Sequence, residues 1–274
     1  MKLLTLRTHT GHRAVRQDGD TLTEIDGFTD VGALLRNPEW SEIAREAVGP
    51  THARAGADLA AVIPAPGKIL CVGLNYRSHI LEMGRQLPEF PTLFAKFPET
   101  LIGANDDIEL PGEDDAVDWE AELAVVIGKT ARRVSAADAP EFIAGYTICN
   151  DVSMRTWQFR TVEWLQGKNW ERSTPLGPAL VTADEFQPGG VIRSIVNDDV
   201  MQEASTGDLV HDPAFLVSYI SQMITLNPGD VIITGTPGGV GHAQKPQRYL
   251  SHGDLLTTSI EGLGEMRNRA VATS

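Results

Sequence analysis

The sequence predicts an α+β fold in which strands outnumber helices, and three observations support this prediction. Residues 118–128 alternate between polar and apolar side chains as a two-faced strand does. Helical patterns are short and few, and one of them, at residues 136–142, is expected to link the strand at residues 118–128 to the next strand. Strand-like segments bounded by turn residues recur along the chain, at residues 3–8, 12–15, 21–25, 69–73, 143–150 and 230–234.

The chain divides into a small first unit and a larger second one. Residues 1–65 hold three short strands, a turn at residues 17–20 and helical stretches at residues 31–35 and 40–47. The sequence Ala65-Pro66-Gly67-Lys68 marks the boundary. We therefore expect a small β-rich N-terminal domain over residues 1–65 and a larger second domain over residues 66–274. The first unit carries no catalytic constellation.

Charge and composition narrow the class of function. The chain has 42% hydrophobic and 22% charged residues and a formal net charge of −14, so a nucleic-acid partner is not expected. An anionic ligand would need a local cation, supplied by a bound metal or by a buried lysine or arginine. The first residues contain too short an apolar run for a signal peptide or a membrane span. With only two cysteines, both in apolar stretches, we expect free buried thiols and a cytoplasmic protein.

The strand at residues 118–128 places acidic and apolar side chains on opposite faces. Asp118, Glu120 and Glu122 share one face, and acids two residues apart on a strand face lie about 7 Å apart, within reach of one cation. The acidic face therefore predicts half of a site for a hard metal ion. The alternative interpretation is a strand whose acidic end is simply exposed to water.

Two further polar patterns are candidates for catalytic groups. His79 and Glu82 lie three residues apart on a predicted helix, where a carboxylate can orient an imidazole that acts as a general base. A second predicted helix, beginning at Asp151, places Asp151, Arg155 and Gln158 on one stripe. Each pattern taken singly is also compatible with ordinary surface polar residues.

Two glycine-rich segments do not match the patterns of phosphate-binding or dinucleotide-binding loops. Gly128-Lys129-Thr130 lacks the first glycine of the phosphate-binding pattern Gly-x-x-x-x-Gly-Lys-Ser/Thr. Residues 235–241 do not match a dinucleotide-binding turn, because Pro237 interrupts them. We expect these last residues to form a loop whose backbone approaches a small ligand.

Together, these segments resemble the fumarylacetoacetate hydrolase family in order and spacing from about residue 68 to 265. The matching motifs are Gly73-Leu74-Asn75-Tyr76-x-x-His79-x-x-Glu82, Glu120-x-Glu122-Leu123-x-x-Val126-Ile127-Gly128, Asn150-Asp151-x-Ser153-x-Arg155-x-x-Gln158, Gly167-Lys168, Leu176-Gly177-Pro178 and Thr234-Gly235-Thr236-Pro237-x-Gly239-Val240-Gly241. The resemblance implies the mixed β-sandwich or roll of that family. Each motif alone is weak, whereas the ordered set is specific.

The resemblance also implies a metal-dependent enzyme. Glu120, Glu122 and Asp151 would hold Mg²⁺ or Mn²⁺, and a 2-oxo or 2-hydroxy-2-enoic acid would be the substrate. We expect hydrolysis of a carbon–carbon bond in an acylpyruvate such as fumarylpyruvate, as in the degradation of aromatic compounds. The remaining roles that we predict from this resemblance are catalysis for His79, Glu82 and Lys168, and substrate binding for Asn75, Tyr76, Arg155, Gln158 and Thr236.

Several alternatives stay open at this point. Relatives with the same site catalyse isomerisation, tautomerisation or decarboxylation, for example of a 2-hydroxy-diene-dioate or of oxaloacetate. A catalytically silent binding protein is a further alternative, although all presumed ligands are intact. The resemblance also implies a homodimer, with residues 192–209 as a plausible interface element, and a segment around His79 and Glu82 that closes over the ligand.

Overall fold

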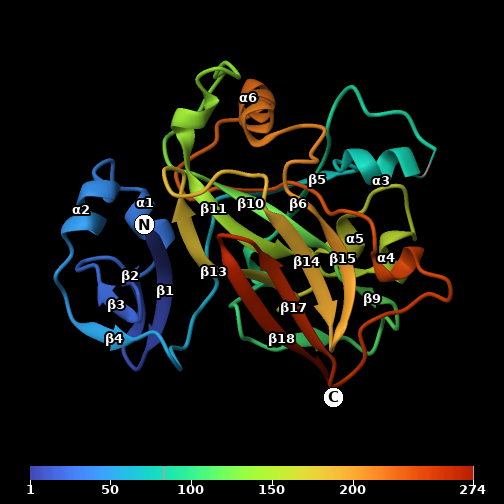
Figure 1. Ribbon diagram of the computed structural model, residues 1–274, viewed down its shortest axis with the longest axis horizontal. Coiled ribbons are helices and arrows are strands. Elements are labelled where there is room, and N and C mark those ends of the chain that lie inside the picture. Colours follow the sequence, from blue (N-terminus) through green and yellow to red (C-terminus); the bar gives the residue numbers. More distant parts are fainter. Residues whose placement is uncertain (83, 274) are drawn as a thin grey trace.

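The computed structural model describes residues 1–82 and 84–273. Most of the chain lies in strands, and two sheets pack face to face (Figure 1). The larger sheet has 11 strands in the order β4-β3-β2-β1-β13-β11-β10-β16-β5-β6, with β7 paired to β13. Its strands are β1 (Lys2–Thr8), β2 (Gly11–Asp18), β3 (Thr21–Glu24), β4 (Thr51–Ala53), β5 (Ile69–Gly73), β6 (Thr92–Lys96), β7 (Leu101–Ile102), β10 (Ala121–Ile127), β11 (Ile143–Asn150), β13 (Thr174–Thr182) and β16 (Val231–Ile233).

The second sheet has five strands in the order β15-β14-β17-β18-β8. It consists of β8 (Ile108–Leu110), β14 (Val191–Val196), β15 (Asp199–Ser205), β17 (Leu255–Ile260) and β18 (Gly264–Ala272). A separate two-stranded ribbon pairs β9 (Val117–Asp118) with β12 (Ser153–Met154). This architecture confirms the predicted strand-rich α+β fold.

Helices are short and lie at the edges of the sheets. They are α1 (Val31–Leu35), α2 (Trp40–Glu46), α3 (Arg77–Glu82), α4 (Arg155–Gln158), α5 (Leu165–Lys168) and α6 (Pro213–Met223), with 3₁₀ turns η1 (Pro98–Thr100), η2 (Ala139–Phe142) and η3 (Gly241–Ala243). Figure 1 shows α1 and α2 beside the N-terminal strands, and α3 and α4 on the opposite side of the molecule. No helix of the described residues is long and apolar enough to cross a membrane.

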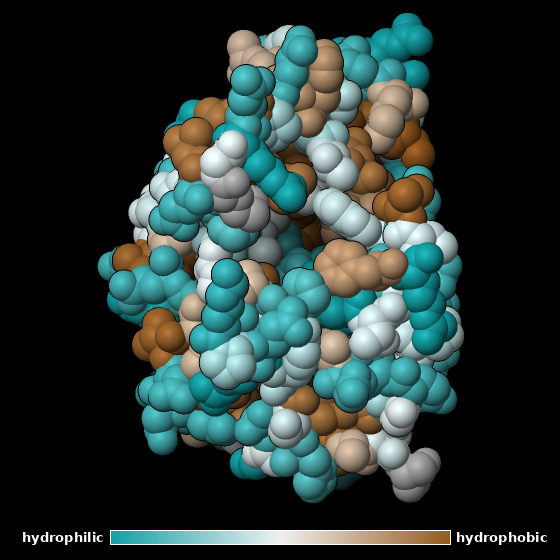
Figure 2. Space-filling view, turned by 90° about the vertical axis from the view of Figure 1, so that its right-hand side faces the viewer, coloured by the Kyte–Doolittle hydropathy of each residue, from teal (hydrophilic) through white to brown (hydrophobic). Residues whose placement is uncertain are grey.

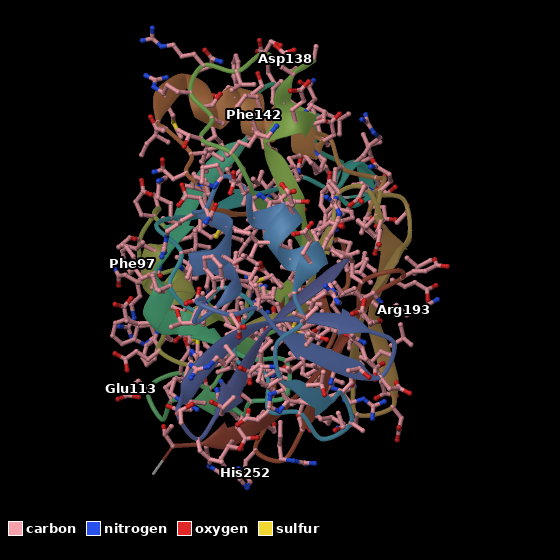
Figure 3. The ribbon with its side chains drawn as sticks, turned by 90° about the vertical axis from the view of Figure 1, so that its left-hand side faces the viewer. Phe97, Glu113, Asp138, Phe142, Arg193 and His252 are labelled. Carbon is pink, nitrogen blue, oxygen red and sulfur yellow. The ribbon has the colours of Figure 1, made fainter. Side chains whose placement is uncertain are left out.

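The N-terminal strands continue the large sheet. Strand β1 pairs antiparallel with β13, with Leu3 opposite Leu180, so the sheet runs unbroken from the first unit into the second. Figure 3 views the molecule from this side, with Asp138 and Phe142 at one end and His252 at the other. The predicted division at residue 65 lies in the connection before β5 and stays a prediction.

Strand β10 is the central element of the fold. Antiparallel β11 and β16 flank it, and all seven of its residues are buried. Leu123, Val125 and Ile127 enter one hydrophobic cluster, whereas Ala124 and Val126 enter another on the opposite face. The predicted alternation is therefore confirmed, but neither face is exposed to water.

Two predicted helices differ from the structure. Residues 136–142 were expected to be helical, yet only the 3₁₀ turn η2 forms, in a segment that contains Pro140. The helix expected to begin at Asp151 begins instead at Arg155, because Ser153 and Met154 pair with β9. Asp151 thus follows the end of β11, as a residue at a strand terminus rather than on a helical stripe.

Candidate active site

The antiparallel pairing of β10 and β11 brings three carboxylates together. Ala121 at the start of β10 lies opposite Asn150 at the end of β11, so Glu120, Glu122 and Asp151 meet at one edge. One oxygen from each lies within 4.8 Å of those of the other two, and all three residues are buried. The interpretation of an exposed acidic strand end is therefore wrong.

Backbone and side-chain bonds hold these acids in place. The amide nitrogen of Asp151 donates to the carbonyl oxygen of Glu120 at 2.8 Å, and the nitrogen of Glu120 donates to Asn150 Oδ1 at 2.9 Å. The side chain of Asn150 in turn donates to Thr258 Oγ1 on the second sheet. Glu122 accepts from the backbone nitrogen of Gly235. The cluster is thus fixed from both sheets and from the loop after β16.

Three permanent cations surround the acids. Lys168 Nζ lies 2.6 Å from Glu120 Oε2 and 2.8 Å from Asp151 Oδ2, and Lys96 Nζ lies 2.8 Å from Asp151 Oδ1. Arg155 donates to Glu120 Oε1 at 2.7 Å and to Asp118 Oδ2 at 2.8 Å. All three cations are buried, so unpaired they would be costly.

The pKa values follow from this pairing. Burial alone would raise the pKa of Asp151, but Lys168 and Lys96 outweigh it and hold that pKa below its usual range. Burial would lower the pKa of Lys168, whereas Asp151 and Glu120 keep it well above its ordinary value. Lys168 is therefore an ammonium ion throughout the physiological pH range, and it can stabilise negative charge but cannot act as a base.

Glu122 is the acid for which a metal ion is the fitting partner. Within residues 1–82 and 84–273 no lysine, arginine or histidine forms an ion pair with it. Burial, and then the charges of Asp151 and Glu120, raise its pKa well above the usual range. A bound dication would reverse that shift. The donor set fits the group, because oxygen-only sites with open positions suit Mg²⁺ or Mn²⁺.

A cavity of about 310 Å³ opens onto this cluster. Figure 2 views the side of the molecule that carries α3 and α4, and shows it hollowed between hydrophilic and hydrophobic side chains. Of the residues predicted from the sequence, those that line the cavity are His79, Glu120, Glu122, Arg155, Gln158, Lys168 and Thr236. Phe94, Phe159 and Trp164 supply apolar walls.

The hydroxyl of Thr236 and the amide of Gln158 are fixed by hydrogen bonds. Thr236 Oγ1 donates to the carbonyl oxygen of Ala121 at 2.9 Å and accepts from Gln202 Nε2 at 2.8 Å. Gln158 Oε1 accepts from Arg155 at 2.8 Å. The glycine-rich loop after β16 lines the cavity through Thr236 and Val240, and its approach to a ligand stays a prediction.

His79 lies on α3 at the wall of the cavity, half-buried. A Cβ atom at Gly238 would lie 2.9 Å from His79 Nδ1, so the absence of a side chain there lets the ring approach the loop. Burial lowers the pKa of His79, Glu82 opposes this, and Arg85 reinforces it. The imidazole is therefore neutral near pH 7 and able to accept a proton.

Four predicted residues do not line this cavity: Asp151, which belongs to the buried acidic cluster, and Asn75, Tyr76 and Glu82. Glu82 is exposed and lines a neighbouring cavity together with Tyr76 and His79. Among the described residues neither a hydrogen bond nor an ion pair joins Glu82 to His79. Asn75 donates to the carbonyl oxygens of His211 and Thr234, so its amide holds the framework. The predicted roles of Asn75, Tyr76 and Glu82 stay predictions.

Some residues of the site were not predicted from the sequence. Lys96 stands out in the sequence only as a lysine between aromatic residues, and its pairing with Asp151 depends on β6 lying near the end of β11. Asp118 shares the acidic face with Glu120 and Glu122 but belongs to none of the family motifs, and it accepts hydrogen bonds from Arg155, Gly241 and His242. Arg85 and His242 line the cavity, and no local pattern marks them.

The fold and the acidic cluster together define a family. The model of the fumarylacetoacetate (FAA) hydrolase C-terminal domain matches residues 68–271, and the chain belongs to this family. Oxaloacetate tautomerase fahd2 of Xenopus laevis is 38% identical over 269 residues, which are 93% of this chain and 84% of that protein. Oxaloacetate tautomerase Fahd2a of Rattus norvegicus is 40% identical over 89% of this chain and 80% of its own. Both relatives are named as mitochondrial.

Solved structures share the whole fold. The 5-carboxymethyl-2-hydroxymuconate delta-isomerase of Mycobacterium smegmatis has a TM-score of 0.83 at 35% identity, with 100% of both chains covered. The maleylpyruvate hydrolase of Sphingobium, solved with manganese(II) and pyruvate, has a TM-score of 0.82 at 30% identity, again over 100% of both chains. The named activities thus include tautomerases, an isomerase and a hydrolase, so family membership does not select among them.

Proposed function

We propose that this chain is a metal-dependent tautomerase, which interconverts the enol and keto forms of a short 2-oxo dicarboxylic acid such as oxaloacetate. The observation that carries the proposal is the buried set of Glu120, Glu122 and Asp151, of which Glu120 and Glu122 line a 310 Å³ cavity that also holds a neutral His79. A cavity of that size lies at the small end of ligand sites and suits a four-carbon acid. The two tautomerase relatives, which match 89–93% of the chain, support this choice.

The chemistry requires an acid–base group and a means of holding charge on oxygen. A divalent cation held by Glu120, Glu122 and Asp151 would supply Lewis-acid polarisation of the 2-oxygen. Lys168 keeps its proton, so it would stabilise negative charge as that charge develops on this oxygen. His79 would accept the proton of the enol hydroxyl and return it to C3, which gives the keto form without loss or gain of atoms.

Tautomerisation makes fewer demands on the site than the hydrolysis that the sequence suggested. Carbon–carbon hydrolysis needs an ordered water and an oriented general base, whereas proton transfer between O2 and C3 needs only one group that carries the proton. Glu82 lies three residues after His79 but is not bonded to it among the described residues. This geometry favours tautomerisation.

Hydrolysis of an acylpyruvate is the second candidate. The observation that favours it is the placement of His79 and Glu82 on one short helix beside the cavity. The likeness to the Sphingobium hydrolase, solved with manganese(II) and pyruvate, supports it as well. Hydrolysis would require the side chain of Glu82 to reach the ring of His79 when ligand is bound.

The two proposals are tested by one set of assays on the purified chain with Mg²⁺ or Mn²⁺. The absorbance of enol-oxaloacetate is followed as it decays to the keto form, and pyruvate release is followed from fumarylpyruvate and a simple acylpyruvate. We expect accelerated ketonisation and much slower pyruvate release. Rapid hydrolysis without any acceleration of ketonisation would overturn the tautomerase proposal.

A further inference from the structure

The charges of the acidic cluster can neutralise one carboxylate of a dicarboxylic ligand but not the other. Four carboxylates, those of Asp118, Glu120, Glu122 and Asp151, face three permanent cations. The cluster is therefore short of one positive charge. A dication would leave the site with one positive charge, enough for one carboxylate of the substrate. The other carboxylate needs a further cation, because the chain as a whole carries a charge of −14.

One lysine and two arginines line the cavity, and two of these three side chains already pair with acidic or amide groups of the protein. Arg155 donates hydrogen bonds to Asp118, Glu120 and Gln158, and Lys168 bridges Glu120 and Asp151. The third is Arg85. Its side chain is exposed at the cavity, and within residues 1–82 and 84–273 it forms no ion pair and no side-chain hydrogen bond.

Backbone hydrogen bonds fix the position of Arg85 directly after α3. The amide nitrogen of Arg85 donates to the carbonyl oxygen of Ile80 at 3.1 Å, and that of Gly84 donates to Leu81 at 2.9 Å. These two bonds form the closing pattern of a helix that ends on a left-handed glycine, and Gly84 has a φ of 67°. Two backbone hydrogen bonds thus tie Arg85 to the last turn of α3, and its side chain lines the same cavity as His79.

From these contacts we infer that Arg85 is the residue that recognises the distal carboxylate of the substrate and so selects dicarboxylic over monocarboxylic 2-oxo acids. A guanidinium group presents paired donors that match a carboxylate. The cation at the cavity mouth and the carboxylate cluster at its wall would bind opposite ends of one short diacid. This inference rests on the proposed function for the class of substrate.

Binding of stable ligands tests the inference independently of catalysis. Malate and 2-hydroxybutanoate differ in that malate has a carboxylate where 2-hydroxybutanoate has a methyl group. Calorimetric titration of the Mn²⁺-loaded protein should show tighter binding of malate, by about 10- to 100-fold, as expected for one charge-assisted contact. In Arg85→Ala this preference should disappear through loss of malate affinity, with 2-hydroxybutanoate bound as before. Arg85→Lys should keep part of it.

The same helix offers a matched control. Arg77 is exposed on α3 and lines neither cavity near His79, so Arg77→Ala removes an equal charge and should keep the full preference. A wild-type preference in Arg85→Ala, or its equal loss in Arg77→Ala, would overturn the assignment. Failure of the proposed function would look different, because the ligand preference would hold while enol-oxaloacetate is not turned over.

Discussion

The two sides of the cavity are built in different ways. The side formed by β10 and β11 is buried, and backbone pairing, Asn150, Gly235 and three buried cations fix its acids. The opposite side is the six-residue helix α3, of which Ile80 is the buried residue. The functional groups on and just after this helix make few bonds: no bond joins His79 to Glu82, and the side chain of Arg85 has no partner among the described residues. One side is thus suited to hold a charge and the other to respond to a ligand.

This contrast predicts that changes in the acidic cluster cost more than changes on α3. The largest loss is expected for Glu122→Gln, which keeps the size of the side chain and an acceptor for Gly235 but removes the charge. Turnover should fall by about 10³-fold or more, because a weakened site no longer holds the Lewis acid. Steady-state ketonisation assays over a range of Mn²⁺ concentrations measure this loss.

Thermal unfolding separates this effect from misfolding. Glu122 is a buried acid without an ion-pair partner among the described residues, so its neutral counterpart should leave the metal-free protein at least as stable as the wild type. A large fall in the melting temperature of metal-free Glu122→Gln would contradict the interpretation that the Glu122 carboxylate serves as a metal ligand and does not stabilise the fold.

The next largest effect is expected from the helix. His79→Asn removes the proton carrier and should lower kcat by about 10²-fold or more, with Mn²⁺ affinity unchanged. Glu82→Gln is the matched comparison on the same helix, and should cost less than about tenfold because Glu82 is exposed and not bonded to the ring. An equal loss in the two variants would show that the pair acts as a unit, as hydrolysis requires.

A third prediction concerns stability. Lys168→Met leaves Glu120 and Asp151 without their shared ammonium group in a buried site, so the metal-free protein should lose about 3–5 kcal/mol in free energy of unfolding. Urea denaturation measures this loss. Mn²⁺ should restore more stability to the variant than to the wild type, because the ion replaces the missing positive charge.

Lysine 129 provides the control for this variant. It is exposed at the turn after β10, and Lys129→Met should change the stability by no more than about 0.5 kcal/mol. Equal stability of Lys168→Met and Lys129→Met would show that the cluster does not depend on the buried ammonium group.

The smallest effect is a shift in the pH profile. Because burial and Arg85 lower the pKa of His79, its neutral form should be complete above an ordinary imidazole pKa of about 6.5. Activity should therefore rise with pH on an acid limb that lies below this value. Arg85→Ala removes a cation that lowers the pKa, so the acid limb should move to higher pH. A limb that stays in place would mean that the group titrating is not His79.

The sequence allowed the acidic cluster to be predicted better than its surroundings. Alternation around Glu120 and Glu122 marks a strand face, and the family motif adds Asp151 at the end of another strand. The same alternation could not show that both faces of β10 are buried, because this depends on strands distant in sequence, β16 on one side and β11 on the other.

Long-range partners explain what the sequence did not indicate. Lys96 meets Asp151 across 55 residues, and Gln202 of the second sheet holds Thr236 and the backbone of Ala121. Contacts between residues so far apart in the chain leave no periodic pattern in the sequence. The helix expected at Asp151 failed for the same reason, since pairing of Ser153 with Asp118 keeps that segment extended.

The reaction itself depends on fine geometry that motifs do not encode. The spacing of His79 and Glu82 suggested a hydrolytic pair, yet in the structure only His79 lines the cavity at the acidic cluster, and no bond joins the two side chains among the described residues. The tautomerase proposal follows from this arrangement and from the relatives together.

Manganese binding tests the central claim most directly, because it compares the two sides of the cavity in one experiment. Electron paramagnetic resonance of free Mn²⁺ titrated with protein should show one ion bound per chain in the wild type and in His79→Asn, and a large loss of affinity in Glu122→Gln. Wild-type affinity in Glu122→Gln would contradict the assignment of the cation to Glu120, Glu122 and Asp151.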